Sequence, residues 1–297
     1  MITYSGFRDY KRLVVENNVF TTEILDVETE DFTSLHDIVA RSIGCHGVEV
    51  LYSGGLDSEL VLASCITNKI PCTAITMRLL SNGCVLNAHD LYYSEKFCRT
   101  NSISQSVVDL DVDKFFNNGD HVSYLEPYKI TQPHVATHFW LLNQCTGFPI
   151  IGGDYPWPQI QNNTISPFRH HYSYYDQYMR DHHIRGIGNM LSDCLEMSTL
   201  LVSHHVNLER SDPVRYNGNQ VNISNLKVDM YNQLSGWRFE KRLRSYGWEH
   251  APRALVDLVQ LGADLIRRFG STTSSIVWGK KLADSFGIVP GSNDKFN

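Results

Sequence analysis

The chain has 297 residues, of which 42% are hydrophobic and 20% are charged, so it can bury a core and is not a disordered polymer. Its formal net charge of −6 gives no support for broad binding to nucleic acid or to an anionic membrane. No apolar run reaches the roughly 18 residues of a membrane-spanning helix, and the first residues lack the apolar stretch of a signal peptide. The seven cysteines form no C-x-x-C pair, which favours free thiols in a reducing compartment and predicts a cytoplasmic location.

Strand and helix patterns alternate through the first half of the chain. Residues 1–47 are expected to be a lead-in segment, with a short strand over 19–25 and a helix over 32–43. The β-branched run at 48–52 predicts a buried strand, and the apolar spacing over 57–68 predicts a helix. Such alternation predicts an α/β fold with helices on both faces of a parallel sheet. It continues with strands over 72–77, 104–110 and 149–151 and helices over 88–100 and 133–146.

After about residue 185 the strand patterns stop and helical spacing dominates. We therefore expect a C-terminal helical lobe that partly covers the site, preceded by a Pro-, aromatic- and His-rich connection over 155–183. The predicted domains are a lead-in at 1–47, an α/β core at 48–184 and a helical lobe at 185–297 that packs on the core as one unit. Helices are expected over 186–206, 225–234, 251–269 and 274–286.

Two glycine-acid turns follow predicted strands. The run SGGLDS at 53–58 joins the first core strand to a helix, and Gly152-Gly153-Asp154 follows the strand at 149–151. Glycine takes positive φ and lets the backbone approach a ligand, while a helix N-terminus presents free N–H groups and the positive end of its dipole. Because the carboxyl ends of parallel strands meet at one edge of the sheet, we expect both turns to line a single phosphate-binding site.

The turn at 53–58 matches neither the G-x-x-x-x-G-K-[ST] loop nor the G-x-G-x-x-G fingerprint. It resembles instead the PP-loop of the ATP pyrophosphatase superfamily, whose members cleave ATP between the α and β phosphates. The resemblance is closest to the synthetase domain of asparagine synthetase and β-lactam synthetase. It covers roughly residues 48 to 155 and includes LDVDKFF at 110–116 and QPHVATHFWLL at 132–142.

This resemblance implies an adenine nucleotide α-hydrolase-like fold, with ATP and Mg²⁺ as the groups that the site binds. Leu51 and Met77 are expected beside the adenine, and Asp57 and Asp154 are expected to hold the metal. A cation near the reacting phosphate would come from Lys241 or Lys227, of which Lys241 better matches a Lys-containing segment of the family. The residues expected around the phosphates are Ser53, Gly54, Gly55, Asp57, Ser58, Gly152 and Gly153.

The implied activity is that of an AMP-forming ligase, which adenylates an acceptor oxygen of a small molecule and then forms a C–N bond. The chain departs from the family in two ways. The family turn usually reads S-G-E-G-A-D-E where this chain has only Gly-Gly-Asp. The family's glutaminase domain, which needs an N-terminal Cys nucleophile, is expected to be missing, because this chain begins Met1-Ile2. We therefore expect nitrogen from free ammonia, from an amine or from a separate ammonia-supplying partner.

Two alternatives stay open. A PP-loop enzyme that modifies RNA or a nucleobase would share the loop, but its thiolating relatives carry a catalytic Cys pair and its nitrile-forming relatives a zinc-binding Cys cluster. The sequence shows neither pattern. A non-catalytic ATP-binding module is the other alternative, and the presence of Ser53, Asp57 and Asp154 argues against it.

Overall fold

The computed structural model describes most of the chain between residues 47 and 242, and it divides into two compact units. The first comprises residues 1–76, 90–107 and 145–244, and the second comprises 77–89, 108–144 and 245–297. The described residues are 15–16, 19–20, 47–153, 159–161, 164–166, 174–193, 197, 201, 204–205, 208, 211–212, 220–242, 264–265 and 267. The predicted helices over 32–43 and 274–286 lie outside them, and the predicted domain boundaries stay predictions.

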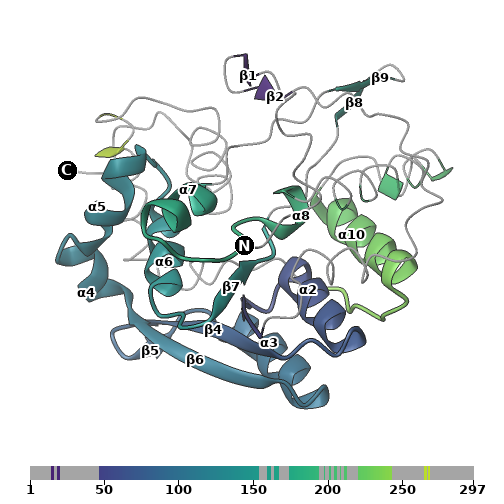
Figure 1. The fold of residues 1–297 in the computed structure, drawn as a ribbon, viewed down its shortest axis with the longest axis horizontal. Coiled ribbons are helices and arrows are strands. Elements are labelled where there is room, and N and C mark those ends of the chain that lie inside the picture. The colour runs from purple at the N-terminus through teal and green to yellow at the C-terminus, as the bar shows by residue number, and fades with distance from the viewer. Residues whose placement is uncertain are drawn as a thin grey trace, which may run out of the picture. The chain divides into compact units, whose positions relative to one another are not determined.

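Five of the described strands form one sheet (Figure 1). Its strands follow the order β5-β4-β3-β7, and β6 also pairs with β4. β3 pairs in parallel with β4 and with β7, which places Leu51 opposite both Ile75 and Ile151. The parallel-dominated sheet flanked by helices confirms the predicted α/β fold. The strands are β3 (Val48–Leu51), β4 (Cys72–Ser81), β5 (Cys84–Val85), β6 (Ser104–Asp111) and β7 (Phe148–Ile151).

The sheet is not wholly parallel, because β4 continues past its predicted end and turns back into β5. Asn82 and Gly83 form the turn, with φ angles of 48° and 75°, and β5 then pairs antiparallel with β4. Asn-Gly is the preferred pair for a two-residue hairpin because both positions need positive φ. The sequence therefore contained the signal for this hairpin, which the prediction of a parallel sheet missed.

Helix positions agree with the sequence pattern where apolar residues recur at helical spacing over a long segment. The predicted helices at 57–68 and 88–100 correspond to α2 (Leu56–Thr67) and α3 (Ala88–Thr100). α6 (Pro133–Leu142) ends before the predicted residue 146. The predicted helix at 225–234 lies inside α10 (Gln220–Ser235). α8 (Met190–Asp193) begins four residues after the start of the helix predicted over 186–206, because Ile187 forms a β-bridge with Ile150 instead. The helices that were not predicted are α4 (Val112–Asn117), α5 (Asp120–Leu125), the 3₁₀ turn η3 (Glu126–Tyr128) and α7 (Tyr174–Asp181).

Four short segments complete the described secondary structure. β1 (Val15–Glu16) pairs antiparallel with β2 (Val19–Phe20), and β2 lies at the start of the strand expected over 19–25. β8 (Gln159–Gln161) pairs antiparallel with β9 (Thr164–Ser166) inside the connection that follows β7. No helix in the described part of the chain is long and apolar enough to cross a bilayer.

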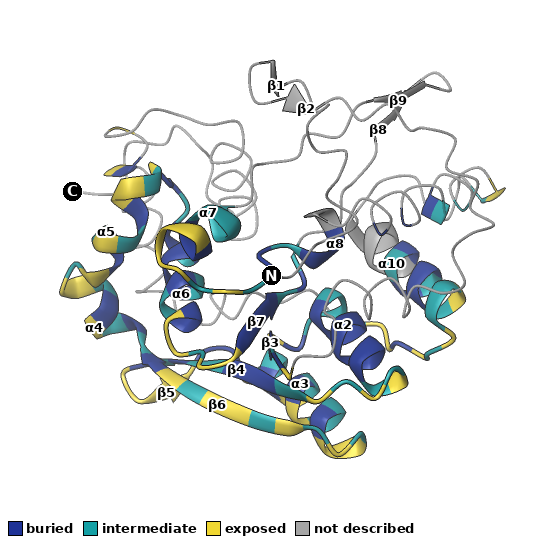
Figure 2. Cartoon of the chain, in the orientation of Figure 1, coloured by how far each residue is buried: buried dark blue, intermediate teal, exposed yellow. Residues whose placement is uncertain are grey.

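The core of the first unit combines residues of the sheet with residues of the C-terminal helices. Val50 of β3 and Leu60 of α2 belong to the same buried cluster as Met230 and Tyr231 of α10. α10 contacts α2, and α2 is buried over much of its length (Figure 2). Burial of this apolar surface, at roughly 25 cal/mol per Å², is what fixes α10 beside the start of α2.

Several helices end in the same way, with a left-handed residue followed by an isoleucine. Lys69, Ser102, Lys129 and His183 have φ angles of 54°, 55°, 51° and 56°. The N–H of the following isoleucine bonds back to a carbonyl in the last turn, as from Ile70 to Cys65 at 2.8 Å. This is the Schellman motif, in which the left-handed position favours glycine. The other isoleucines that bond back are Ile103, Ile130 and Ile184.

We expect Lys69→Gly to raise the free energy of unfolding by about 0.5–1 kcal/mol, because a left-handed L-residue costs about 1–2 kcal/mol and glycine loses part of that gain through unfolded-state entropy. Urea unfolding of the purified protein measures the change. Lys69→Ala is the control, since it keeps the β-carbon and should show no gain. Equal stability of the two variants would contradict the strain at this position.

Candidate active site

The turn between β3 and α2 needs glycine at its second position. Gly54 has φ +82°, and a β-carbon there would collide with the backbone carbonyl of Asp90, in the first turn of α3. An L-residue would meet both the unfavourable dihedral and the collision. The glycine therefore allows the backbone of α3 to lie directly against the turn.

The N-terminus of α2 leaves its backbone donors free. Gly55 is the N-cap, and it provides no side-chain hydrogen bond to the helix. Across the described residues, the N–H groups of Gly55, Leu56, Asp57 and Ser58 have no acceptor. The Ser58 hydroxyl instead donates to the Gly55 carbonyl at 3.2 Å. Free donors and the positive end of the helix dipole together form a site that favours an anion.

The second glycine turn lies against the same helix end, as predicted. A β-carbon on Gly152 would lie 2.8 Å from the backbone nitrogen of Ser58, which leaves no room for any side chain. The Gly152 carbonyl accepts from the Leu191 N–H at 3.0 Å, so α8 holds this turn from its other side. Gly153 follows with φ +82°, and its α-carbon lies against the Asn189 side chain. Asp154 lies outside the described residues.

α10 places a cation and a hydroxyl on the acidic residue of the loop. The Lys227 ammonium lies 2.7 Å and 3.0 Å from the two carboxylate oxygens of Asp57, and the Tyr231 hydroxyl donates to the same carboxylate at 2.5 Å. The side chains of Lys227 and Asp57 are only 17% and 20% exposed, so water screens this pair less than a surface ion pair. Lys227 and Tyr231 share one face of α10 because they are four residues apart.

The two candidate lysines differ in their position relative to the loop. Lys227 contacts the loop, whereas Lys241 is exposed and makes no contact with Asp57. Tyr231 was missed by the sequence analysis, although its spacing from Lys227 was a usable signal.

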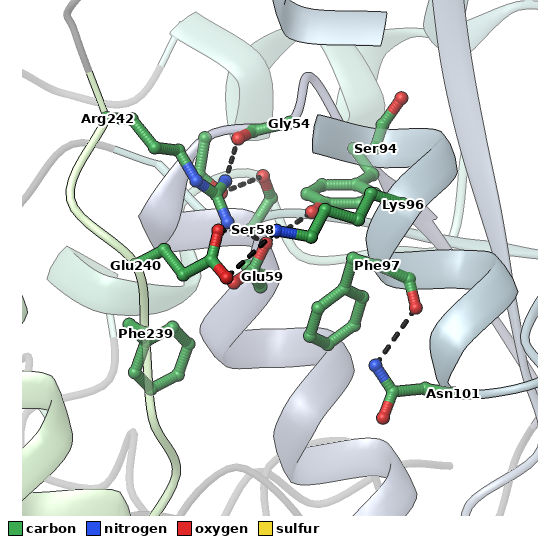
Figure 3. Close-up of polar contacts among 12 residues, drawn as sticks. Gly54, Ser58, Glu59, Ser94, Lys96, Phe97, Asn101, Phe239, Glu240 and Arg242 are labelled. Atoms are coloured by element: carbon green, nitrogen blue, oxygen red, sulfur yellow. Dashed lines mark hydrogen bonds and ion pairs between the residues drawn. The ribbon is translucent and has the colours of Figure 1, made fainter. Parts of the chain in front are cut away.

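Arg242, the neighbour of Lys241, was also missed and lies against the inner side of the loop (Figure 3). Its guanidinium donates to the Gly54 carbonyl and to the Glu59 carboxylate, and its carbon Cζ lies 4.7 Å from the centre of the Tyr93 ring. The Arg242 and Glu59 side chains are 10% and 5% exposed. The Tyr52 hydroxyl donates a hydrogen bond to Glu59. Burial is the main cause that raises the pKa of Tyr52, and the negative charge of Glu59 is the second, so the hydroxyl stays protonated and remains a donor.

The remaining predicted residues are placed as follows. Ser53 is exposed at the start of the turn, and Leu51 is half-buried at the end of β3. Met77 is half-buried in β4, two positions beyond Ile75, which pairs with Leu51. It belongs to the second compact unit, so its predicted role beside an adenine stays a prediction.

The described side chains fit a phosphate better than a metal held by the protein alone. The Asp57 carboxylate, a hard oxygen ligand of the kind Mg²⁺ prefers, already accepts from Lys227 and Tyr231. Among the described residues, no group of three His, Cys, Asp or Glu side chains is placed to hold a metal ion. The uncapped N–H groups of α2, in contrast, have the chemistry of a phosphate cradle.

Comparison with known proteins leaves the family undetermined. No family model matches the chain, and no curated protein matches it. One similar solved structure is a predicted subunit of a tRNA methyltransferase from Methanocaldococcus jannaschii, at 16% identity over 54% of this chain and 75% of that one. Another is the U34-tRNA thiolase NcsA from Methanococcus maripaludis with its [4Fe-4S] cluster, at 12% identity over 77% and 78%. Both have a TM-score of 0.31, which is too low to carry an argument about function.

We expect Gly54→Ala to destabilise the protein by clearly more than Gly83→Ala. Gly83 also has positive φ, but a β-carbon there meets nothing within 4 Å, so its cost is the dihedral cost of about 1–2 kcal/mol alone. Gly54→Ala adds the collision with the Asp90 carbonyl. Urea unfolding of both variants measures the difference, and equal losses would show that the loop has room for a β-carbon.

Proposed function

We propose that this chain is a PP-loop enzyme, which binds ATP at the N-terminus of α2 and cleaves it between the α and β phosphates. The observation that carries the proposal is the run SGGLDS at 53–58, in which the N–H groups of residues 55–58 have no acceptor among the described residues. Because Gly54 and Gly152 have no β-carbon, the backbone at Asp90 and the backbone at Gly152 can both lie directly against this cradle. Such a cradle suits a chain of phosphates because it offers several donors and no side chain in the way.

The proposed reaction needs no covalent protein intermediate. A lone pair of the acceptor oxygen forms a bond to the α phosphorus, and the bond from that phosphorus to the bridging oxygen breaks. The electron pair leaves with pyrophosphate, whose charge the N–H groups of α2 and the ammonium of Lys227 stabilise. Lys227 is the proposed catalytic cation because it is partly buried beside Asp57.

We propose further that a nitrogen nucleophile displaces AMP from the adenylate, which makes the chain a C–N ligase that acts on a small molecule. Cys65 lies about 12 Å along α2 from Asp57, and Cys72 opens β4 opposite the first residue of β3. Burial raises the pKa of Cys98 to about 12, which keeps it a poor nucleophile. The placement of these thiols therefore favours nitrogen over sulfur chemistry.

The second candidate acceptor is a nucleobase in RNA. The proposed loop is common to ligases and to enzymes that modify tRNA, so the loop by itself is compatible with either acceptor. Magnesium stays a prediction about Asp57 and Asp154, and no step above depends on it.

The test is release of AMP and pyrophosphate from ATP by the purified chain. One series of reactions adds candidate small carboxylic acids with ammonium, and a parallel series adds bulk tRNA. Turnover with an acid supports the ligase, and turnover only with tRNA supports the alternative. ATP binding without product in any reaction would overturn the catalytic proposal, and the absence of ATP binding would overturn the PP-loop proposal itself.

We expect Lys227→Met to lower the rate of pyrophosphate release about 100-fold, which is the usual loss when one stabilising donor is removed. Lys241→Met is the matched control and should leave the rate close to that of the wild type, because its side chain is exposed. Circular dichroism checks that both variants fold. Equal losses in the two variants, or no loss in Lys227→Met, would remove Lys227 from the proposed chemistry.

We expect ammonium, or an amine on the substrate, to support AMP formation and glutamine alone to give no AMP, since Cys65 and Cys72 lie away from the loop and burial keeps Cys98 a poor nucleophile. Stepwise addition of each nitrogen donor at fixed ATP and acceptor measures this, with glutamate release followed in parallel. Stoichiometric glutamate release by the purified chain would contradict an external supply of ammonia.

A further inference from the structure

The segment that follows α10 brings a buried charge back to the phosphate loop. Residues 236–242 leave the end of the helix, and Arg242 reaches the inner side of the turn that precedes α2 (Figure 3). The same segment carries Glu240, which forms an exposed ion pair with Lys96 of α3 at 2.7 Å. The Arg242 side chain, in contrast, is only 10% exposed and contacts the loop backbone.

The hydrogen bond from Arg242 fixes one peptide plane in the loop. Its acceptor is the Gly54 carbonyl, which shares a planar trans peptide with the Gly55 N–H. In a trans peptide the carbonyl and the N–H point in opposite directions. By holding the Gly54 carbonyl on the inner side, Arg242 turns the Gly55 N–H toward the open side, where it has no acceptor among the described residues.

The guanidinium is itself held by several groups. Glu59 accepts a hydrogen bond from the guanidinium, and the Tyr52 hydroxyl donates to the same Glu59 carboxylate. The Tyr93 ring lies against the face of the guanidinium. The Arg242 Nε is buried and has no hydrogen-bond partner in the part of the chain that the structure describes. A buried ion pair with an unsatisfied donor contributes little net stability compared with apolar packing, so what this arrangement supplies is a defined orientation.

We propose that Arg242 is a positioning residue, which aims the Gly55 N–H at the β and γ phosphates by holding the Gly54 carbonyl. This inference rests on the proposed binding of ATP and adds the residue that presets its phosphate cradle. Lysine cannot replace it, because a single ammonium lacks the planar fork that spans the carbonyl and the Glu59 carboxylate together.

The experiment compares the wild type with Arg242→Lys and Glu59→Gln. Glu59→Gln removes the charge that orients Arg242 but leaves the guanidinium in place. Glu240→Gln is the matched control, since it breaks the exposed ion pair on the same segment. Calorimetric titration with ATP and with inorganic pyrophosphate measures the affinity, and thermal unfolding measures the stability of each variant.

A positioning role predicts that Arg242→Lys and Glu59→Gln each bind both ligands at least ~10-fold more weakly, the equivalent of one lost charged hydrogen bond. The control should bind like the wild type. The titrations are run well below the unfolding midpoint of each variant, so that any loss of affinity is measured on folded protein. Unchanged affinity in Arg242→Lys and Glu59→Gln, with only a lower midpoint, would overturn the inference and leave Arg242 a structural residue. Failure of the wild type to bind either ligand would instead overturn the proposed function.

Discussion

The N-terminus of α2 can present its donors only because two stretches of backbone press against it with no side chain between them. Gly54 lets the carbonyl of Asp90 approach from α3, and Gly152 lets the end of β7 approach the nitrogen of Ser58. The parallel pairing of β3 with β7 sets this up, since Leu51 and Ile151 lie opposite each other and both turns leave the sheet at the same level. The proposed phosphate cradle depends on this close contact.

Two cations hold the first turn of α2, each on a different side of the helix. Asp57 and Glu59 are two positions apart and so face different sides of the helix. α10 supplies Lys227 and Tyr231 to one side, and the segment after α10 supplies Arg242 to the other. Each carboxylate is therefore neutralised by a cation from the C-terminal part of the first unit, while the N–H groups of residues 55–58 have no acceptor among the described residues.

Local signals predicted the elements that carry the loop. The β-branched run before Ser53 and the apolar spacing after it correspond to β3 and α2, and α3 has the predicted bounds of 88 and 100. Short helices such as α4 and α5 escaped prediction because about six residues are too few to show a helical period. The β4–β5 hairpin escaped because the alternation of strands and helices was given more weight than the Asn-Gly pair.

Local signals could not predict the partners of the loop, because these residues lie far from it in the sequence. Lys227 is 170 positions from Asp57, and Arg242 is 183 positions from Glu59. Sequence context favoured Lys241, but consecutive residues outside a helix face different sides, and it is Arg242 that turns inward. The sequence by itself determined the α/β fold and the glycine turn, since both follow from residue spacing and backbone freedom. Only the tertiary structure decided which cations meet that turn, because burial of α10 against α2 sets their positions.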